Sequence, residues 1–245
     1  MERKFVRRIE LTGCLPAGSY LHDVPAVRWL KTTGALEFHS PVTFLVGENG
    51  VGKSTLLEAI AVACGFNPEG GSRNFRFSTK ETHSELSAAL TVVRSAYPKD
   101  GFFLRAESFY NAASYIGALG APDIIAQYGG LPHEKSHGES FLALVQNRFR
   151  GHGLYLLDEP EAALSPMRLL TLLGEIDRLV ADGSQLILST HSPILMTFPG
   201  AEVLEITESG IQAVPYRETA HFEITRRFLE SPERMLRVLL ERDVK

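Results

Sequence analysis

An eight-residue glycine-rich segment, residues 47–54 (GENGVGKS), constrains the fold of this chain more than any other feature. The residues before it, 42–46 (VTFLV), form a compact β-branched and aromatic run that predicts a buried strand. The residues after it show helical spacing over 54–63. A strand, a loop of the form GxxxxGK[ST] and a helix in this order are the pattern of a Walker A phosphate-binding loop, and this context argues against a chance match.

Each residue type in this loop suits the binding of ATP. The glycines allow a tight turn in which successive backbone N–H groups face phosphate oxygens, and the helix N-terminus adds positive potential. Lys53 is expected to reach the β- and γ-phosphates, and the hydroxyl of Ser54 is expected to bind Mg²⁺. The predicted nucleotide-binding residues of this region are Gly47, Glu48, Asn49, Gly50, Val51, Gly52, Lys53, Ser54 and Thr55.

Two adjacent carboxylates follow a second apolar run about a hundred residues later. Residues 154–157 (LYLL) predict a central strand that ends in Asp158 and Glu159, a Walker B pattern. In α/β sheets, ligands bind at the carboxyl ends of the strands. Asp158 is therefore expected to hold Mg²⁺ through water, and Glu159 to orient and deprotonate the attacking water. The alternative for this pair alone is a solvated acidic turn.

A third segment, residues 136–140 (SHGES), precedes a helix expected over 139–150 that leads into the Walker B strand. A serine and a glycine at a helix N-terminus form an anion-binding site. Because Lys53 is already assigned to one set of phosphates, a second such site suggests a second copy of the chain. The alternative is an ordinary N-cap with a glutamate in the first turn.

Taken together, these motifs resemble the ATP-binding-cassette (ABC) ATPases, and within them the SMC, Rad50 and RecF branch, over about residues 40–200. Residues 136–140 look like the signature motif, 163–166 (ALSP) like the D-loop, and 189–193 (STHSP) like the switch-histidine segment. The resemblance implies two chains that sandwich two ATP molecules. It assigns Ser136 and Gly138, with Glu139 beside them, to the partner chain's nucleotide. It also assigns His191 to the γ-phosphate in its own chain, and an imidazole there can donate to phosphate.

Two family features are uncertain in this sequence. The family usually has a glutamine after the strand expected at 101–105, whereas this chain has Glu107 nearby. Glu107 is the candidate for metal or water contact, and a surface glutamate is the alternative. The candidates for stacking on adenine are Tyr20, Trp29 and Arg7, with core packing as the alternative for Trp29. A loop with Arg73 and Arg76 could contact nucleotide, partner chain or nucleic acid, or be solvated.

Strands that alternate with helices predict an α/β fold, a mostly parallel sheet flanked by helices with a small N-terminal antiparallel β subdomain. We expect one ABC-type ATPase domain over 1–245. Within it, about 1–45 plus 85–105 would form the antiparallel part, 109–150 a helical part with the signature segment, and 220–245 a helical tail. Residues 12–35 are expected to be loop-rich, 87–94 a strand, and 203–215 a hairpin.

Charge, cysteine content and hydropathy limit the partners and the compartment that we expect for this protein. A net charge of −4 argues against a wholly basic nucleic-acid binder and leaves a local basic patch open. Cys14 and Cys64 lack metal-site spacing, which favours free thiols in a reducing compartment. The sequence shows neither a signal peptide nor an apolar run of membrane-spanning length, so we expect a cytoplasmic protein that contacts membranes only through a partner.

Three functions remain open from the sequence. The first is an ATP-hydrolysing homodimer acting in DNA maintenance or defence, without the coiled-coil arms of SMC and Rad50, because no sustained heptads follow Lys53. The second is the nucleotide-binding subunit of an ABC transporter, although these usually have LSGGQ and the missing glutamine. The third is a non-catalytic nucleotide-dependent switch, against which the intact Lys53, Asp158, Glu159 and His191 argue.

Overall fold

The computed structural model describes residues 4–72, 85–106 and 137–240, and its centre is a six-stranded sheet. Five strands are parallel, and β9 runs antiparallel to β8. In spatial order they are β5 (Asp100–Arg105), β6 (Gly153–Asp158), β7 (Gln185–Ser189), β3 (Val42–Val46), β8 (Glu202–Thr207) and β9 (Gly210–Ala213). Every residue of β3, β6 and β7 is buried, as their near-continuous apolar sequences predict for central parallel strands.

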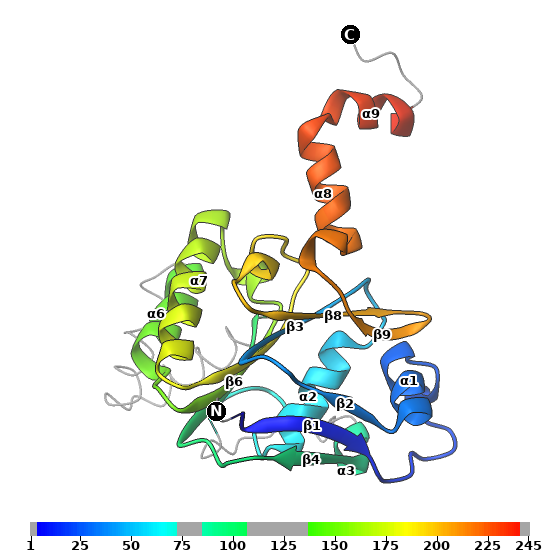
Figure 1. Cartoon of the computed structure of the whole chain (residues 1–245), viewed down its shortest axis with the longest axis vertical. Helices are drawn as coiled ribbons and strands as arrows, with labels where there is room; N and C mark the ends of the chain where they lie inside the picture. The colour runs from blue at the N-terminus through cyan, green and yellow to red at the C-terminus, as the bar shows by residue number, and fades with distance from the viewer. Residues whose placement is uncertain (1–3, 73–84, 107–136, 241–245) are drawn as a thin grey trace.

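A second, three-stranded antiparallel sheet lies below the first (Figure 1). It consists of β2 (Ala35–Glu37), β1 (Val6–Leu11) and β4 (Leu90–Arg94), with β1 in the middle. Helix α2 (Lys53–Ala63) lies between the two sheets, and its apolar residues join both in one core. The predicted α/β class with an antiparallel subdomain is therefore confirmed.

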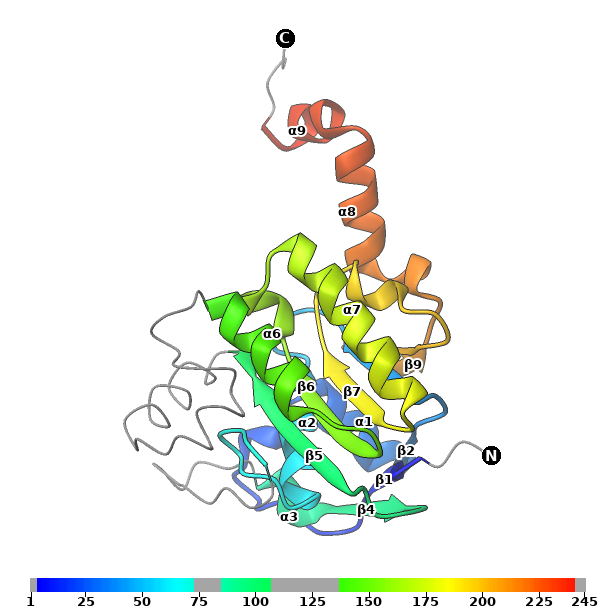
Figure 2. The same cartoon turned by 90° about the vertical axis from the view of Figure 1, so that its left-hand side faces the viewer.

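Two helices cover the other face of the large sheet (Figure 2). Helix α6 (His137–Arg148) and helix α7 (Pro166–Ala181) form a second core with the sheet residues that point away from α2. Residues alternate between the two cores along each strand: Leu154 and Leu156 face α2, whereas Tyr155 and Leu157 face α6 and α7. The site-bearing strands are thus fixed from both sides.

Three local predictions are wrong. Residues 12–35 contain helix α1 (Pro25–Thr33), which begins with proline and ends at Gly34 in the left-handed conformation, a sequence pattern that marks helix ends. The expected strand 87–94 begins with a short helix, α3 (Leu86–Ala89). Strand β5 belongs to the parallel sheet beside β6, so 100–105 is not part of the antiparallel subdomain, and neither is β3.

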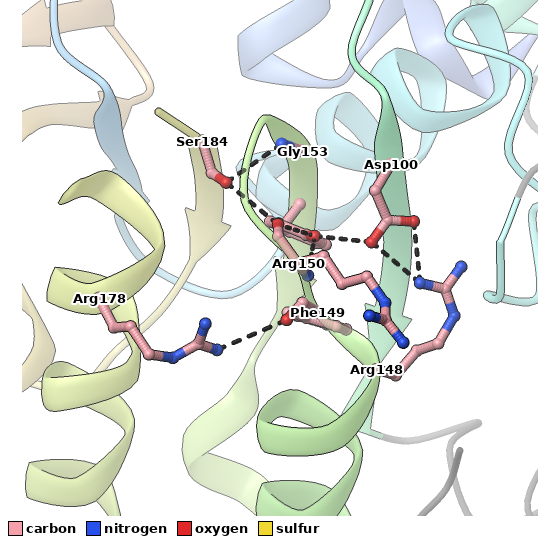
Figure 3. A network of polar contacts seen from close by, with 8 residues as sticks. Asp100, Arg148, Phe149, Arg150, Gly153, Arg178 and Ser184 are labelled. Atoms are coloured by element: carbon pink, nitrogen blue, oxygen red, sulfur yellow. Dashed lines mark hydrogen bonds and ion pairs between the residues drawn. The ribbon is translucent and has the colours of Figure 1, made fainter. Parts of the chain in front are cut away.

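Polar contacts join the beginnings of β5 and β6 to the end of α6 (Figure 3). They lie at the amino ends of these strands, whereas the glycine-rich loop follows the carboxyl end of β3. Arg148 Nη1 donates to both oxygens of Asp100, at 2.8 and 2.9 Å. The hydroxyl of Tyr155 lies 2.9 Å from the same carboxylate and accepts the N–H of Arg150 at 2.6 Å. Burial and the neighbouring Asp100 raise the pKa of Tyr155, which keeps this phenol neutral.

The chain then leaves the body as a two-helix arm, α8 (Ala220–Glu230) and α9 (Pro232–Leu240), which projects from the sheet (Figure 1). The expected hairpin of β8 and β9 and the helical tail are both present in the described residues. Short 3₁₀ segments complete the fold: η1 (Tyr20–His22), η3 (Pro160–Ala163), η4 (Leu195–Thr197) and η5 (Tyr216–Glu218). Within the described ranges, no helix combines the length and apolarity needed to cross a membrane.

Candidate nucleotide-binding site

The glycine-rich loop turns between β3 and α2 as predicted, and two of its glycines are required by space as well as by conformation. Gly47 has φ +141°, and a Cβ there would lie 2.2 Å from the carbonyl oxygen of Ile206 on β8. Gly52, with φ +101°, would place a Cβ 2.4 Å from Val24. The loop therefore packs closely against β8 and the start of α1, which holds its backbone in place.

Lys53, the first residue of α2, folds back over this loop. Its Nζ donates to the carbonyl of Gly47 at 2.8 Å and to that of Glu48 at 3.0 Å, and the residue is buried. Burial lowers the pKa of Lys53, whereas the carboxylates of Glu159 and Asp158 oppose that effect. The ammonium group is thus held at the mouth of the loop, with Ser54 half-buried beside it.

Asp158 ends β6 and is buried among polar groups. It accepts a hydrogen bond from the hydroxyl of Ser189 on β7, and its Oδ2 lies 3.4 Å from Nε of Arg105. Arg105 also pairs with Glu58 on α2 at 2.8 Å. Arg105 was not predicted as a site residue; its only signal is the register that places it opposite Asp158 on the adjacent strand.

Glu159 follows with a left-handed backbone, φ +48°, which is unusual for a residue other than glycine. Its N–H donates to the carbonyl of Ser189 at 3.1 Å, which links the ends of β6 and β7. Its side chain is 40% exposed, and Oε1 lies 3.5 Å from Nε2 of His191. The carboxylate is therefore accessible and stands beside the predicted histidine.

Glu161, in η3, was also missed. Its carboxylate accepts the hydroxyl of Thr190 at 2.9 Å and the backbone N–H of His191. Burial raises the pKa of Glu161, and the hydrogen bonds from Thr190 and His191 oppose this. Glu161 thereby fixes the segment after β7 to the segment after β6, and sequence spacing alone gave no sign of it.

His191 lies where the sequence predicted, just beyond β7, and has a partner that was not predicted. Its Nδ1 lies 2.7 Å from Nε2 of His221, in the first turn of α8. Burial lowers the pKa of His191, and Lys53 and His221 lower it further. Its Nε2 is buried and has no hydrogen-bond partner among the described residues.

Gly138, the second residue of α6, lies very close to the last residue of η3. A Cβ at Gly138 would lie 2.8 Å from the carbonyl of Ala163 and 2.6 Å from Nη1 of Arg168. Glu139 pairs with Arg168 at 2.9 Å. The predicted signature helix and D-loop are therefore in contact. Four predicted candidates lie outside the described residues: Ser136, Glu107, Arg73 and Arg76.

The three adenine candidates lie in different surroundings. Trp29 packs against the hairpin turn, because a Cβ on Gly210 would lie 2.3 Å from its Cδ1, and it contacts the core of α2. Tyr20 is 65% exposed and Arg7 is exposed. Core packing therefore accounts for Trp29, and the structure brings neither Tyr20 nor Arg7 into a recorded contact with the loop.

The donor set at this edge suits Mg²⁺ held together with phosphate oxygens. A hydroxyl at Ser54 and a carboxylate at Asp158 are oxygen ligands, which Mg²⁺ prefers. The described residues contain no cluster of three or more His, Cys, Asp or Glu side chains that would hold a metal by themselves. A metal shared with a nucleotide needs fewer protein ligands, so the residues fit such an ion.

Two family models match separate parts of the chain. One, described as an AAA domain, matches residues 27–99. The other, described as "AAA domain, putative AbiEii toxin, Type IV TA system", matches residues 136–197. The first match contains the Walker A loop, and the second contains the signature segment, Walker B and His191.

Curated relatives include transporter ATP-binding proteins. The cytochrome c biogenesis ATP-binding export protein CcmA of Legionella pneumophila (strain Paris) is 29% identical over 186 residues, which cover 71% of this chain and 88% of that protein. The ribose import ATP-binding protein RbsA 1 of Rhizobium meliloti (strain 1021) is 28% identical over 192 residues, 68% of this chain and 37% of that protein.

Similar solved structures include an ABC transporter subunit and an SMC head domain. The cbiO1 subunit of the ABC transporter complex cbiONQ from Clostridium perfringens aligns with a TM-score of 0.48 and 16% identity, covering 97% of this chain and 99% of that one. The SMC head domain from Thermotoga maritima aligns with a TM-score of 0.44 and 15% identity, covering 86% and 99%.

Proposed function

We propose that this chain, which has the α/β P-loop fold of the ABC-type ATPases, binds ATP with Mg²⁺ and hydrolyses it as a homodimer in the cytoplasm. The observation that supports this most strongly is the convergence of Lys53, Asp158, Glu159 and His191 at one edge of the sheet. Relatives whose names include ATP-binding, and the two AAA-domain matches, agree with it.

In this proposal the loop and Lys53 bind the triphosphate. Backbone N–H groups of residues 47–53 and the N-terminus of α2 supply donors and positive potential. Lys53 exchanges its two carbonyl partners for phosphate oxygens, a stronger, charge-assisted contact. Ser54 and Asp158 would hold Mg²⁺, which would neutralise phosphate charge. Arg105 and Ser189 keep the Asp158 carboxylate oriented toward the site.

Glu159 is the proposed general base. Its carboxylate is exposed enough to accept a proton from water, and its left-handed backbone turns the side chain away from the strand direction. His191 would donate from Nε2 to the terminal phosphate as negative charge develops there. The 3.5 Å between Nε2 of His191 and Oε1 of Glu159 supports their proposed roles as donor and base at one reacting group.

The second copy of the chain would complete the site. Ser136 and Gly138, with Glu139, would approach the partner's nucleotide from the N-terminus of α6, a helix end that attracts anions. The close contact between Gly138 and Ala163 then joins the signature segment to the D-loop within each copy. Glu107 remains the candidate for an additional contact to metal or water.

A transporter subunit is the second candidate, and the similarity to the export protein CcmA and the import protein RbsA 1 favours it. DNA maintenance or defence rests on the resemblance to the SMC and RecF branch. A transporter subunit should gain ATPase activity only with its membrane partner, whereas a nucleic-acid enzyme should respond to duplex DNA, single-stranded DNA or RNA in a salt-dependent manner. ATPase rates with each nucleic acid over a salt series separate the two.

ATP turnover by the purified chain tests the proposal itself. We expect Mg²⁺-dependent phosphate release that is lost in Lys53→Ala and retained in Lys99→Ala, a matched change at the amino end of β5. Wild-type protein that neither binds nor hydrolyses ATP would contradict the proposal. Binding without turnover would favour either the non-catalytic switch or a transporter subunit that lacks its membrane partner.

A further inference from the structure

We propose that His221 is a positioning residue that holds His191 in the tautomer with the proton on Nε2. This inference rests on the proposed function, in which Nε2 of His191 donates to the terminal phosphate. His221 comes from the first turn of the projecting arm and contacts Nδ1 of His191, whereas Glu159 faces Nε2 of the same ring. Its Nε2 lies 2.7 Å from Nδ1 of His191, with ring centroids 4.7 Å apart.

The argument begins with the hydrogen bond between the two rings. A neutral imidazole has one N–H donor and one lone-pair acceptor, so one ring must donate and the other accept. Burial lowers the pKa of His191, which keeps that ring neutral. If Nε2–H of His221 donates, Nδ1 of His191 accepts and its proton must reside on Nε2.

Glu159 selects between the two arrangements. Nε2 of His191 lies 3.5 Å from Oε1 of Glu159. A proton on Nε2 faces that carboxylate favourably, whereas a lone pair there would face negative charge. The same nitrogen is buried and has no hydrogen-bond partner within the described chain, so it is the atom left available for a ligand oxygen. The ring pair therefore points its spare donor into the nucleotide site.

The first turn of α8 holds His221 in place for this contact. Thr219 is fully buried, donates to the carbonyl of Tyr216 at 2.7 Å and caps the helix by accepting from Phe222 at 3.4 Å. The N–H of Ala220 donates to Glu205 on β8 at 3.1 Å. The base of the arm is thus fixed to the sheet, although the rest of α8 and α9 projects away from it (Figure 1).

Loss of His221 should change the chemistry more than the binding of ATP. Without a donor at Nδ1, His191 can place its proton on Nδ1 and turn a lone pair toward phosphate. Removal of a group that orients a functional histidine typically costs about 10- to 100-fold. We expect kcat to fall by about that factor while KM for ATP stays within about 3-fold, because Lys53 and the loop N–H groups are unchanged.

Two substitutions at His221 distinguish its role in orienting the His191 ring from its role as a packed side chain. His221→Leu removes the donor and keeps an apolar side chain, whereas His221→Gln retains an N–H donor of similar reach. We expect Leu to reduce kcat and Gln to restore most of it. His191→Ala combined with His221→Leu should be no slower than His191→Ala alone. His39→Leu, an exposed imidazole paired only with Glu37 in the described structure, is the control and should leave kcat unchanged.

Ring ¹⁵N NMR of histidine-labelled, nucleotide-free protein tests the inference independently of ATP turnover. Wild type and His221→Gln should show His191 with its proton on Nε2, and His221→Leu should show a shift toward Nδ1. A proton on Nδ1 in wild type, or no tautomer change in His221→Leu, would overturn the inference. Failure of the proposed function would show instead as absent ATPase activity with the NMR result intact.

Discussion

At the scale of single residues, Lys53 is the positive charge among several carboxylates. Glu159, Asp158, Glu161 and Glu48 all act to raise its pKa, against the larger effect of burial. Its two present partners are backbone carbonyls, which a nucleotide can replace without leaving a charge unpaired. The residue is therefore arranged to exchange one set of oxygens for another.

Lys53→Ala should weaken ATP binding by about 10- to 100-fold, since a hydrogen bond to a charged group contributes about 1.5–3 kcal/mol. Isothermal titration with a slowly hydrolysed ATP analogue measures this directly. Lys99→Ala is the matched control and should bind like wild type. Equal affinities for wild type and Lys53→Ala would remove Lys53 from the site.

The raised pKa of Glu161 predicts how the free energy of unfolding changes with pH. Its folded pKa is raised by burial, so the folded chain binds more protons than the unfolded chain at pH values just above the ordinary 4.5. The contribution of this carboxyl to stability is thus fully present at lower pH and decreases as pH rises through the folded pKa. Glu161→Gln should remove that decrease. Urea unfolding of both proteins from pH 4 to 7 checks it, and parallel pH profiles would contradict it.

At the scale of elements, the sequence predicts a helix or strand best where its pattern of apolar residues fits one type of element alone. Strands β3, β6 and β7 are apolar throughout because both faces are covered, and the glycine-rich loop fixes the position of α2. Helix α1 was missed because its short amphipathic pattern lies among glycines and prolines. Strand β5 was assigned to the wrong sheet because strand pairing depends on distant residues rather than on local pattern.

Site residues, like strand pairing, are predictable from the sequence only where a local pattern identifies them. Lys53, Asp158, Glu159 and His191 belong to motifs whose spacing along the chain reveals their chemistry. Arg105, Glu161 and His221 enter through strand register and through the packing of separate elements. No local pattern distinguishes these three from ordinary surface charges and histidines, so only the folded arrangement reveals them.

The network around Tyr155 tests how β5, β6 and α6 are held together. Tyr155→Phe removes the hydroxyl and leaves the partly buried N–H of Arg150 without this partner while keeping the ring stacked on Phe149. We expect a loss of about 1–3 kcal/mol in the free energy of unfolding. Tyr97→Phe, at a ring that is 77% exposed, is the control and should change stability little. Equal unfolding curves for all three proteins would show that the network is not stabilising.

At the scale of the whole molecule, the predicted catalytic groups lie at the carboxyl ends of the parallel strands, and the Tyr155 network lies near their amino ends, where β5 and β6 begin. The arm leaves from the nucleotide edge, where His221 contacts His191. Gly138, at the start of α6, lies against Ala163. In the proposed homodimer, these features would face the second copy across two nucleotides.

Ser136→Arg tests the assignment of the signature segment to the partner's nucleotide. A large cation there should block ATP-dependent association and reduce turnover by at least about 10-fold, while the isolated monomer keeps nearly unchanged ATP affinity. Analytical ultracentrifugation with nucleotide, combined with ATP titration, provides both readouts. A large loss of affinity in the monomer would instead place Ser136 in its own chain's site.

Size-exclusion chromatography of Glu159→Gln with and without ATP–Mg²⁺ tests the central claim most directly. Removal of a general base costs about 10²- to 10⁴-fold in turnover and leaves the phosphate-binding groups intact. The account predicts a monomer without nucleotide, a stable dimer with ATP, and almost no phosphate release, whereas Glu208→Gln should behave as wild type. A Glu159→Gln protein that stays monomeric at saturating ATP, or that hydrolyses ATP at the wild-type rate, would contradict the account.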